Sequence, residues 1–119
     1  MEVHFTARKF RPRKEVRTDA IASVRKLDKY YGGIMRADII LSFEHSSPTV
    51  KAVEINMHVY GMLLSAKEQS EEFGKSIDLA VAKIERQLAK YKTKLHMKNK
   101  KALRRVKEDV VAVSVEEEE

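Results

Sequence analysis

The chain has 119 residues, of which 43% are apolar and 35% are charged, with a formal net charge of +6. These values fit one domain with a single core and argue against wholesale disorder. The sequence has no cysteine, which excludes disulfides and thiol catalysis, and no apolar run of the roughly 20 residues that span a bilayer. Its first ten residues also lack a signal-like apolar core, so we expect a soluble cytoplasmic protein with no membrane partner.

The first third of the chain predicts a strand, a basic loop and a helix. Polar and apolar residues alternate over 2–7, which is typical of a half-buried strand. A basic loop follows at residues 8–13, and the helix after it is expected to end at about Tyr31, before a Gly-Gly pair. Its apolar face recurs every three or four positions, at Val16, Ala20, Val24, Leu27 and Tyr31.

Three further strand-like segments come next. Apolar and polar residues alternate over 37–44 and, with a more regular period of two, over 53–60. A Ser-Ser-Pro turn at 46–48 separates these segments. Gly61 lies at the bend into a weaker segment at 62–67 and predicts a hairpin.

Residues 72–95 predict the longest element, an amphipathic helix. Its apolar residues share one stripe of a 3.6-residue repeat, at Phe73, Ile77, Ala80, Val81, Ile84, Leu88, Tyr91 and Leu95. A second stripe beside it is cationic and consists of Lys83, Arg86, Lys90 and Lys94. Asp78 and Glu85 fall on the opposite flank. The helix should therefore bury one side and present a one-sided row of cations.

The predicted element order is β-α-β-β-β-α, which belongs to the α+β class. With two helices, the expected architecture is a four-stranded mixed sheet covered on one face by both helices. The β-α-β start requires a right-handed crossover, so the first two strands should be parallel. The remaining strands should form an antiparallel meander.

The composition changes after Leu95. Residues 75–107 carry 12 cations and 2 anions, whereas residues 108–119 carry 6 acidic side chains and no cation. We assign residues 1–96 to the folded domain and residues 97–119 to a flexible, basic-then-acidic tail, into which the helix can run for a turn or more. This charge distribution favours a polyanionic partner, with nucleic acid first and an anionic membrane second.

The sequence contains no recognisable catalytic or metal-binding pattern. The four histidines lack zinc-ligand spacing, and there is no phosphate-binding glycine loop or glycine-framed serine. Glu116–Glu119 lacks the turn residues that would fold it around a cation. We therefore expect a protein that is not an enzyme and has no cofactor, metal or small-molecule substrate.

The two faces of the predicted fold differ in charge. The open face of the sheet is acidic to neutral and lacks aromatic pairs for base stacking, since it consists of Glu2, His4, Thr6, Asp38, Ser42, Glu44, Glu54, Asn56 and His58. Nucleic acid should dock on the helical side, where Arg25 and Lys29 would line a groove with the cationic stripe and recognise phosphates. The alternative, that each stripe is a solvated helix face, stays open.

The sequence resembles the ribosome hibernation factors, namely the hibernation promoting factor and the ribosome-associated inhibitor also called protein Y. The resemblance covers about residues 1–95 and rests on the element order and on three segments: RKLDKYY at 25–31, ADIILS at 37–42 and IDLAVAKIERQLAKYKTKL at 77–95. It implies a fold related to double-stranded RNA-binding domains. The 24 residues after Leu95 cannot hold the C-terminal domain of long members, and the glutamate-rich end is similar to that of protein Y, a short form.

The resemblance also implies a function. Such a protein binds the small ribosomal subunit and its RNA in the cleft between head and body, and blocks the messenger and transfer RNA sites in stationary-phase or stressed cells. In the family, basic residues of both helices face ribosomal RNA, and the matching positions here are Arg25, Lys26, Lys29, Lys83, Arg86, Lys90, Lys92 and Lys94. Lys92 stands apart because it lies toward the anionic flank of the helix. Off the ribosome we expect a monomer.

One departure and two alternatives accompany this resemblance. The family commonly has Asp-x-Tyr just before the second helix, where this chain has Glu72-Phe73-Gly74, so Phe73 is the candidate replacement for the tyrosine. A general binder of duplex RNA would show equal affinity for any A-form helix. A transcription regulator acting on a sigma factor, an older role ascribed to the family, would bind a protein independently of RNA.

Overall fold

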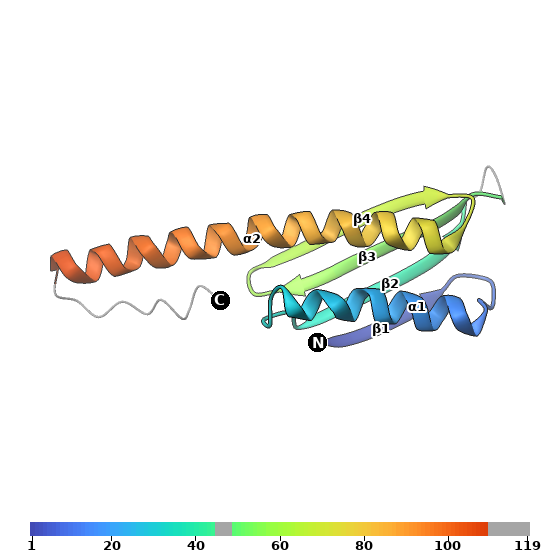
Figure 1. The fold of residues 1–119 in the computed structure, drawn as a ribbon, viewed down its shortest axis with the longest axis horizontal. Helices are drawn as coiled ribbons and strands as arrows, with labels where there is room; N and C mark the ends of the chain where they lie inside the picture. The colour runs from blue at the N-terminus through green and yellow to red at the C-terminus, as the bar shows by residue number, and fades with distance from the viewer. Residues whose placement is uncertain (45–48, 110–119) are drawn as a thin grey trace.

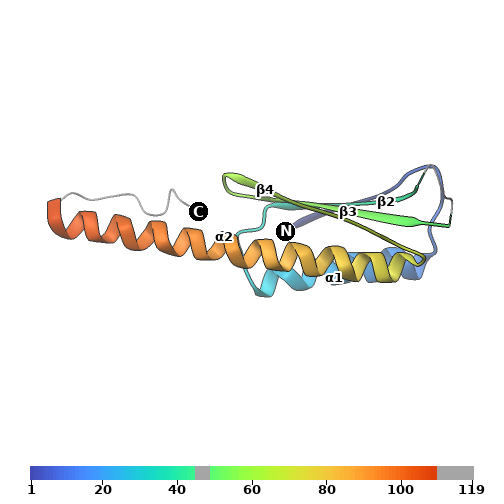
Figure 2. The same cartoon turned by 90° about the horizontal axis from the view of Figure 1, so that it is seen from above.

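A computed structural model of the chain describes residues 1–44 and 49–109, with side chains as far as Leu95. The elements in chain order are β1 (Glu2–Ala7), α1 (Lys14–Arg25), the 3-10 helix η1 (Lys26–Lys29), β2 (Arg36–Phe43), β3 (Lys51–Val59), β4 (Met62–Ser70) and α2 (Phe73–Asp109). They form two layers, with both helices on one face of the sheet (Figure 1, Figure 2). The predicted element order and α+β architecture are confirmed.

The sheet has four strands in the order β1-β2-β3-β4. β1 is parallel to β2, as the right-handed crossover through α1 requires, and the other two pairs are antiparallel. One cross-strand row runs Val3, Ala37, Met57 and Leu64 and lies on the side of the helices. The mixed sheet and its two kinds of pairing therefore agree with the prediction.

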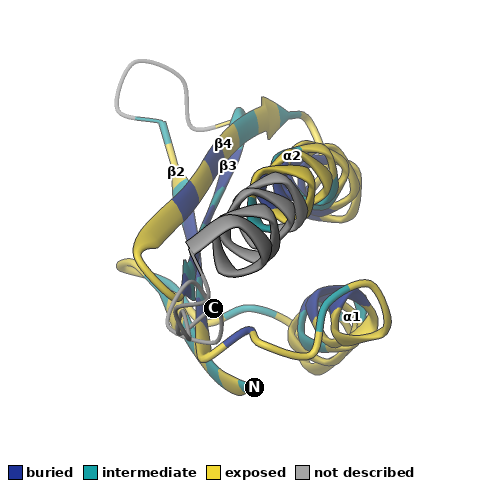
Figure 3. Cartoon of the chain, turned by 90° about the vertical axis from the view of Figure 1, so that its left-hand side faces the viewer, coloured by how far each residue is buried: buried dark blue, intermediate teal, exposed yellow. Residues whose placement is uncertain are grey.

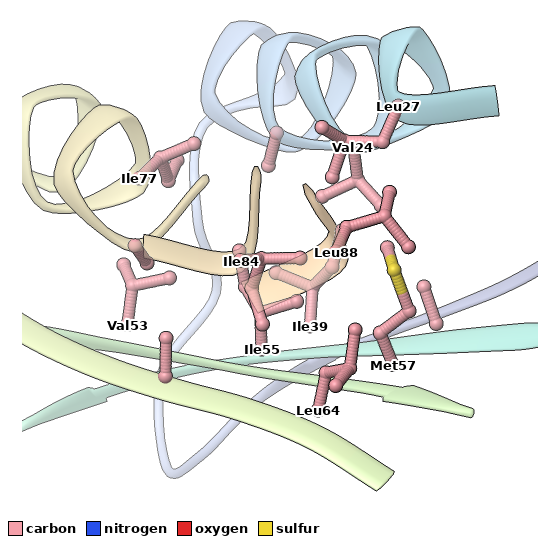
Figure 4. Packing of buried hydrophobic residues seen from close by; sticks show 14 of the residues in the cluster. Val24, Leu27, Ile39, Val53, Ile55, Met57, Leu64, Ile77, Ile84 and Leu88 are labelled. Carbon is pink, nitrogen blue, oxygen red and sulfur yellow. The ribbon is translucent and has the colours of Figure 1, made fainter. Parts of the chain in front are cut away.

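The core is a single layer of apolar side chains between the sheet and the helices (Figure 4). Ile39 and Ile55 rise from the two central strands, and Ile84 and Leu88 descend from α2 to meet them, all with no exposed surface. The inner sides of α1 and α2 are buried and their outer sides are exposed (Figure 3). The 3.6-residue stripes of the sequence thus correspond to the buried sides of both helices.

The β3–β4 hairpin forms at the predicted place. Val59 pairs with Met62, so Tyr60 and Gly61 make a two-residue loop. Gly61 has a φ of 74°, a left-handed conformation that glycine adopts without steric cost. β4 extends to Ser70, three residues beyond the predicted end, because its ladder with β3 continues to Lys51. The predicted Ser-Ser-Pro turn at 46–48 lies outside the described residues.

α1 ends differently from the prediction, and α2 runs into the predicted tail, as the sequence allowed. α1 proper ends at Arg25 and tightens into η1, so the segment expected to be one helix to Tyr31 is a helix followed by a 3-10 turn. α2 continues to Asp109, well past the boundary at 96, since no glycine or proline follows Gly74 and lysine, arginine, alanine and leucine favour helix. Residues 110–119, including the acidic end Glu116–Glu119, lie outside the described residues.

The sheet supports only the first half of α2. Tyr91 Oη donates a 2.8 Å hydrogen bond to the carbonyl oxygen of Tyr60, which lies in the β3–β4 loop at the end of the sheet. Asp109 is 18 residues farther along, so about 27 Å of helix projects beyond this contact (Figure 1).

Three phenylalanines close the other end of the molecule, where α2 begins. Phe10 stacks on Phe73 with ring centroids 5.2 Å apart and contacts Phe43 edge-on at 4.8 Å. Phe43 also contacts Phe73 edge-on at 5.5 Å. These three residues are far apart in the sequence, so their cluster ties the β1–α1 loop to β2 and to the start of α2.

Two leucines of α2 allow a test of how far the stability of the fold depends on the buried apolar side of this helix. Leu88 is fully buried, whereas Leu79 on the same helix is 40% exposed. We expect Leu88→Ala to lower the free energy of unfolding by about 3 kcal/mol, because it removes buried methylene groups and leaves a cavity. The matched change Leu79→Ala should cost less than about 1 kcal/mol. Urea unfolding followed by circular dichroism measures both, and equal losses would contradict this packing.

Candidate nucleic-acid interface

The cationic stripe of α2 lies along the flank that borders β4. Lys83 Nζ is 2.5 Å from Glu68 Oε2 of β4. One turn later, the side chain of Gln87 accepts a hydrogen bond from the Ser65 amide at 3.1 Å and donates one to its carbonyl at 2.8 Å. Arg86, Lys90 and Lys94 are exposed and continue this flank by helical periodicity. We call Lys83, Arg86, Lys90 and Lys94 the α2 row.

The groove between the two helices has a mixed charge. A cavity of about 250 Å³ there is lined by Lys26 and Lys29 from η1 and by Asp78 and Glu85 from α2. Lys92 also points to this side, because its Nζ donates a hydrogen bond to the carbonyl oxygen of Tyr30. The sequence placed Lys92 toward the anionic flank, and the structure agrees.

Arg25 lies in a third place. Its Nη1 is within 3.5 Å of the carbonyl oxygen of Met1, at the start of the edge strand β1. The eight residues singled out by the sequence therefore divide into the α2 row, an inter-helix set of Lys26, Lys29 and Lys92, and Arg25 alone.

The expected groove shared by Arg25, Lys29 and the α2 row is not formed. Asp78 and Glu85 line the side of α2 that faces η1, so the α2 row points away from the other helix. The helical wheel already separated the cations from these two carboxylates. It could not say which flank would face α1, because that depends on the path of the chain through the sheet.

The open face of the sheet is polar and partly acidic, as predicted. Asp38 pairs with two groups on this face, with Arg36 Nε at 2.8 Å from Oδ1 and His58 Nε2 at 3.2 Å from Oδ2. Partial burial alone would raise the pKa of the Asp38 carboxyl, but the hydrogen bonds to Arg36 and His58, with their charges, outweigh burial and lower it below its ordinary value. This face carries no aromatic pair in the described part of β1 to β4.

The sequence of this chain matches a known protein family over most of its length. The family model described as Sigma 54 modulation protein / S30EA ribosomal protein matches residues 3–96. The chain belongs to this family. The description names a ribosomal protein and a modulator of sigma 54, and it names no enzymatic activity.

Curated relatives of this family member are ribosome hibernation promotion factors. The Bacillus subtilis (strain 168) protein is 29% identical over 75 residues, which are 63% of this chain and 40% of that protein. The Staphylococcus aureus (strain COL) protein is 28% identical over 88 residues, which are 70% of this chain and 46% of that protein. The chain thus spans less than half the length of these two relatives.

Solved structures share the fold of this family member. A ribosomal subunit interface protein from Coxiella burnetii superimposes with a TM-score of 0.71 at 24% identity, covering 78% of this chain and 99% of that one. The N-terminal domain of Thermus thermophilus protein Y gives a TM-score of 0.67 at 23% identity, covering 76% of this chain and 99% of that one. Within the described residues of this family member, no helix has the length and apolarity to cross a membrane.

The Phe73 position, where the sequence departs from the common Asp-x-Tyr, contributes to packing. Phe73 is 9% exposed and belongs to the phenylalanine cluster. Gly74 is exposed, and a Cβ at this position would meet no atom within 4 Å. Phe73 therefore accounts for packing at this point, whereas position 74 carries no side chain to contact a partner.

The Asp38 centre supplies a pH test of the open face. We expect Asp38→Asn to lower the free energy of unfolding at pH 7 by roughly 0.5–1 kcal/mol, since the ion pair is partly exposed. A lowered carboxyl pKa stabilises the fold above the unfolded-state pKa, and this contribution is lost as the pH falls through the folded-state pKa. The difference between the two proteins should therefore shrink as the pH falls below the ordinary pKa of an aspartate and through the lowered pKa of Asp38. Urea titrations from pH 2 to pH 7 measure it, and a constant difference would contradict the assignment.

Proposed function

We propose that this protein is a ribosome hibernation factor of the cytoplasm. It binds the small ribosomal subunit through ribosomal RNA and inhibits translation by occupying the messenger and transfer RNA sites. The observation that carries this proposal is the α2 row, a one-sided series of exposed cations on a rigid helix, in a member of the S30EA ribosomal protein family.

The α2 row suits the RNA backbone rather than the bases. Lys83 and Lys94 are 11 residues apart, so the row extends over about 16 Å of helix. Cations along a rigid line contact successive phosphates and release their counterions, which makes the affinity steeply dependent on salt. The described part of the sheet surface offers no aromatic pair for stacking, so recognition of RNA shape is favoured over recognition of sequence.

The inter-helix set would add a second group of phosphate contacts. Lys26, Lys29 and Lys92 are all exposed, although Asp78 and Glu85 lie beside the first two and reduce the local positive potential. We therefore expect this set to contribute less to affinity than the α2 row. Arg25, which is near the N-terminus of the chain, is expected to contribute separately.

The projecting half of α2 adds length to the basic helix. The sequence has six lysines and arginines between residues 98 and 107 and no acidic residue before Glu108. A helix that carries this composition about 27 Å beyond the sheet would extend the contact along a polyanion.

The first experiment is co-sedimentation with purified small subunits over a series of salt concentrations. We expect one protein per subunit, retention in an excess of structured competitor RNA, and loss of transfer RNA binding. If structured competitor RNA binds the protein as tightly as small subunits do, and so displaces it from them, the protein is a general duplex-RNA binder. If binding requires a sigma factor and survives ribonuclease, the transcription role replaces this proposal.

The contribution of the α2 row is measured with two matched variants. Arg86→Gln/Lys90→Gln removes two exposed cations from the row, whereas Arg36→Gln/Lys67→Gln removes two from the open sheet face. We expect the first to weaken binding to small subunits roughly tenfold and to reduce the slope of log K against log salt by about 1.4–1.8. The second should leave the slope nearly unchanged. Equal effects would mean that only net charge matters.

A further inference from the structure

The β1–α1 loop carries the densest positive charge in the first half of the chain. Residues 8–17 contain six cations and one anion. All six cations are exposed, and we call them the loop surface: Arg8, Lys9, Arg11, Arg13, Lys14 and Arg17. Neither the sequence motifs nor the proposed contacts of the helices assign a role to these residues.

The loop surface is not explained by the stability of the fold. In the described part of the chain, none of these cations lies within 4 Å of a carboxylate. Lys14 begins α1, and Arg13 is its N-cap and makes no side-chain capping bond. Cations at this end of a helix oppose the helix dipole and cost stability. Six cations without a carboxylate partner, of which Arg13 and Lys14 lie at the unfavourable end of the helix, indicate that they serve a partner.

The backbone that carries these cations is restrained by contacts with the rest of the fold. The amide of Arg8 donates a 2.9 Å hydrogen bond to the carbonyl of Leu41, which fixes the start of the loop to β2. Lys9 has a φ of 62°, which turns the chain, and Phe10 inserts into the phenylalanine cluster. The following Arg11 stays exposed. Because the loop is ordered before it meets a partner, less conformational entropy is lost on binding.

The loop surface is concave where it meets α1. A cavity of about 390 Å³ is lined by three cations, Arg11, Lys14 and Arg17, and by no acidic residue. Arg17 also lies over an aromatic ring, with its guanidinium carbon 5.8 Å from the centroid of Phe5, a cation–π contact. The other residues that line it, Phe5, Ala7 and Pro12, are apolar. Three cations around one cavity without a carboxylate fit a phosphate group, whose oxygens accept hydrogen bonds from several cations at once.

This cavity is too far from the α2 row to share one phosphate with it. The cavity is lined by Phe5 and Ala7 of β1, whereas Lys83 of the α2 row pairs with Glu68 of β4. β1 and β4 are the two edge strands of the sheet, so three strand spacings, roughly 14 Å, separate the cavity from the row across the sheet. The loop surface would therefore contact a different part of a bound polyanion from the part that contacts the α2 row.

We propose that the loop surface is a second, independent binding site for the phosphate backbone of RNA, so that bound RNA is held at both edges of the sheet. This inference rests on the proposed function in that the RNA is ribosomal RNA. The new inference goes beyond the proposed function because it assigns an RNA contact to Arg11, Lys14 and Arg17, which belong neither to the α2 row nor to the inter-helix set.

The test compares Arg11→Gln/Lys14→Gln with the open-face control Arg36→Gln/Lys67→Gln, using purified small subunits and fluorescent RNA fragments over a salt series. We expect the loop variant to bind small subunits roughly tenfold more weakly, with a salt slope reduced by about 1.4–1.8. Combined with Arg86→Gln/Lys90→Gln, the two losses should multiply, because sites more than about 10 Å apart act independently. Thermal unfolding of each variant establishes that it is folded.

The outcomes separate this site from the proposed function. If the wild type binds subunits and the loop variant matches the control, the loop site is wrong and the hibernation role stands. If the wild type ignores subunits but binds RNA fragments in a loop-dependent way, the loop site stands and the hibernation role fails. If an acidic protein binds the loop surface while RNA affinity is unchanged, the site belongs to a protein partner and the inference is overturned.

Discussion

Burial of the inner stripe of α2 on the sheet is the interaction on which the other features of this protein depend. Ile84 and Leu88 meet Ile39 and Ile55 in a layer from which water is excluded. Each fully buried side chain of this size contributes about 1.5–3 kcal/mol, which is large against a net domain stability of roughly 5–15 kcal/mol. Since the stripe must face the sheet, the charged flanks of α2 have no freedom to rotate. Packing of apolar residues therefore decides where the cations point.

The direction of the cations has an electrostatic consequence. In the part of α2 whose side chains are described, the flank toward β4 carries the α2 row, of which Lys83 pairs with Glu68. The flank toward η1 carries Asp78 and Glu85 together with Lys92. Two stripes of opposite sign on one helix produce a dipole across the molecule. A polyanion would approach the β4 side of α2 more readily than the groove between the helices. In the proposed complex, the α2 row would therefore meet the RNA before Lys26, Lys29 and Lys92 do.

Much of this fold could be predicted from the sequence, because the strands and helices follow from the spacing of apolar residues that are close together in the chain. Period-two and period-3.6 repeats predict the strands and both helices, and the β-α-β order predicts the parallel pair. The flank of α2 that faces α1 could not be predicted, because it depends on the path of the whole chain. The cluster of Phe10, Phe43 and Phe73 was also missed, since no spacing rule connects residues so far apart. The extension of α2 to Asp109 did have a signal, namely the absence of glycine and proline after Gly74.

Two cationic surfaces on one rigid body also offer a route to specificity without base contacts. A lone row of lysines and arginines binds almost any RNA, because phosphates are present in every sequence. If the loop surface binds RNA as well, a good ligand must present phosphates at both edges of the sheet, which are roughly 14 Å apart. The phenylalanine cluster holds this separation constant, because it fastens the loop to the first residue of the same helix that carries the α2 row. A folded RNA with the right spacing would then gain both contacts with little loss of entropy, whereas a flexible RNA would have to be ordered to do so. The spacing of the charges, and not their number, would select the partner.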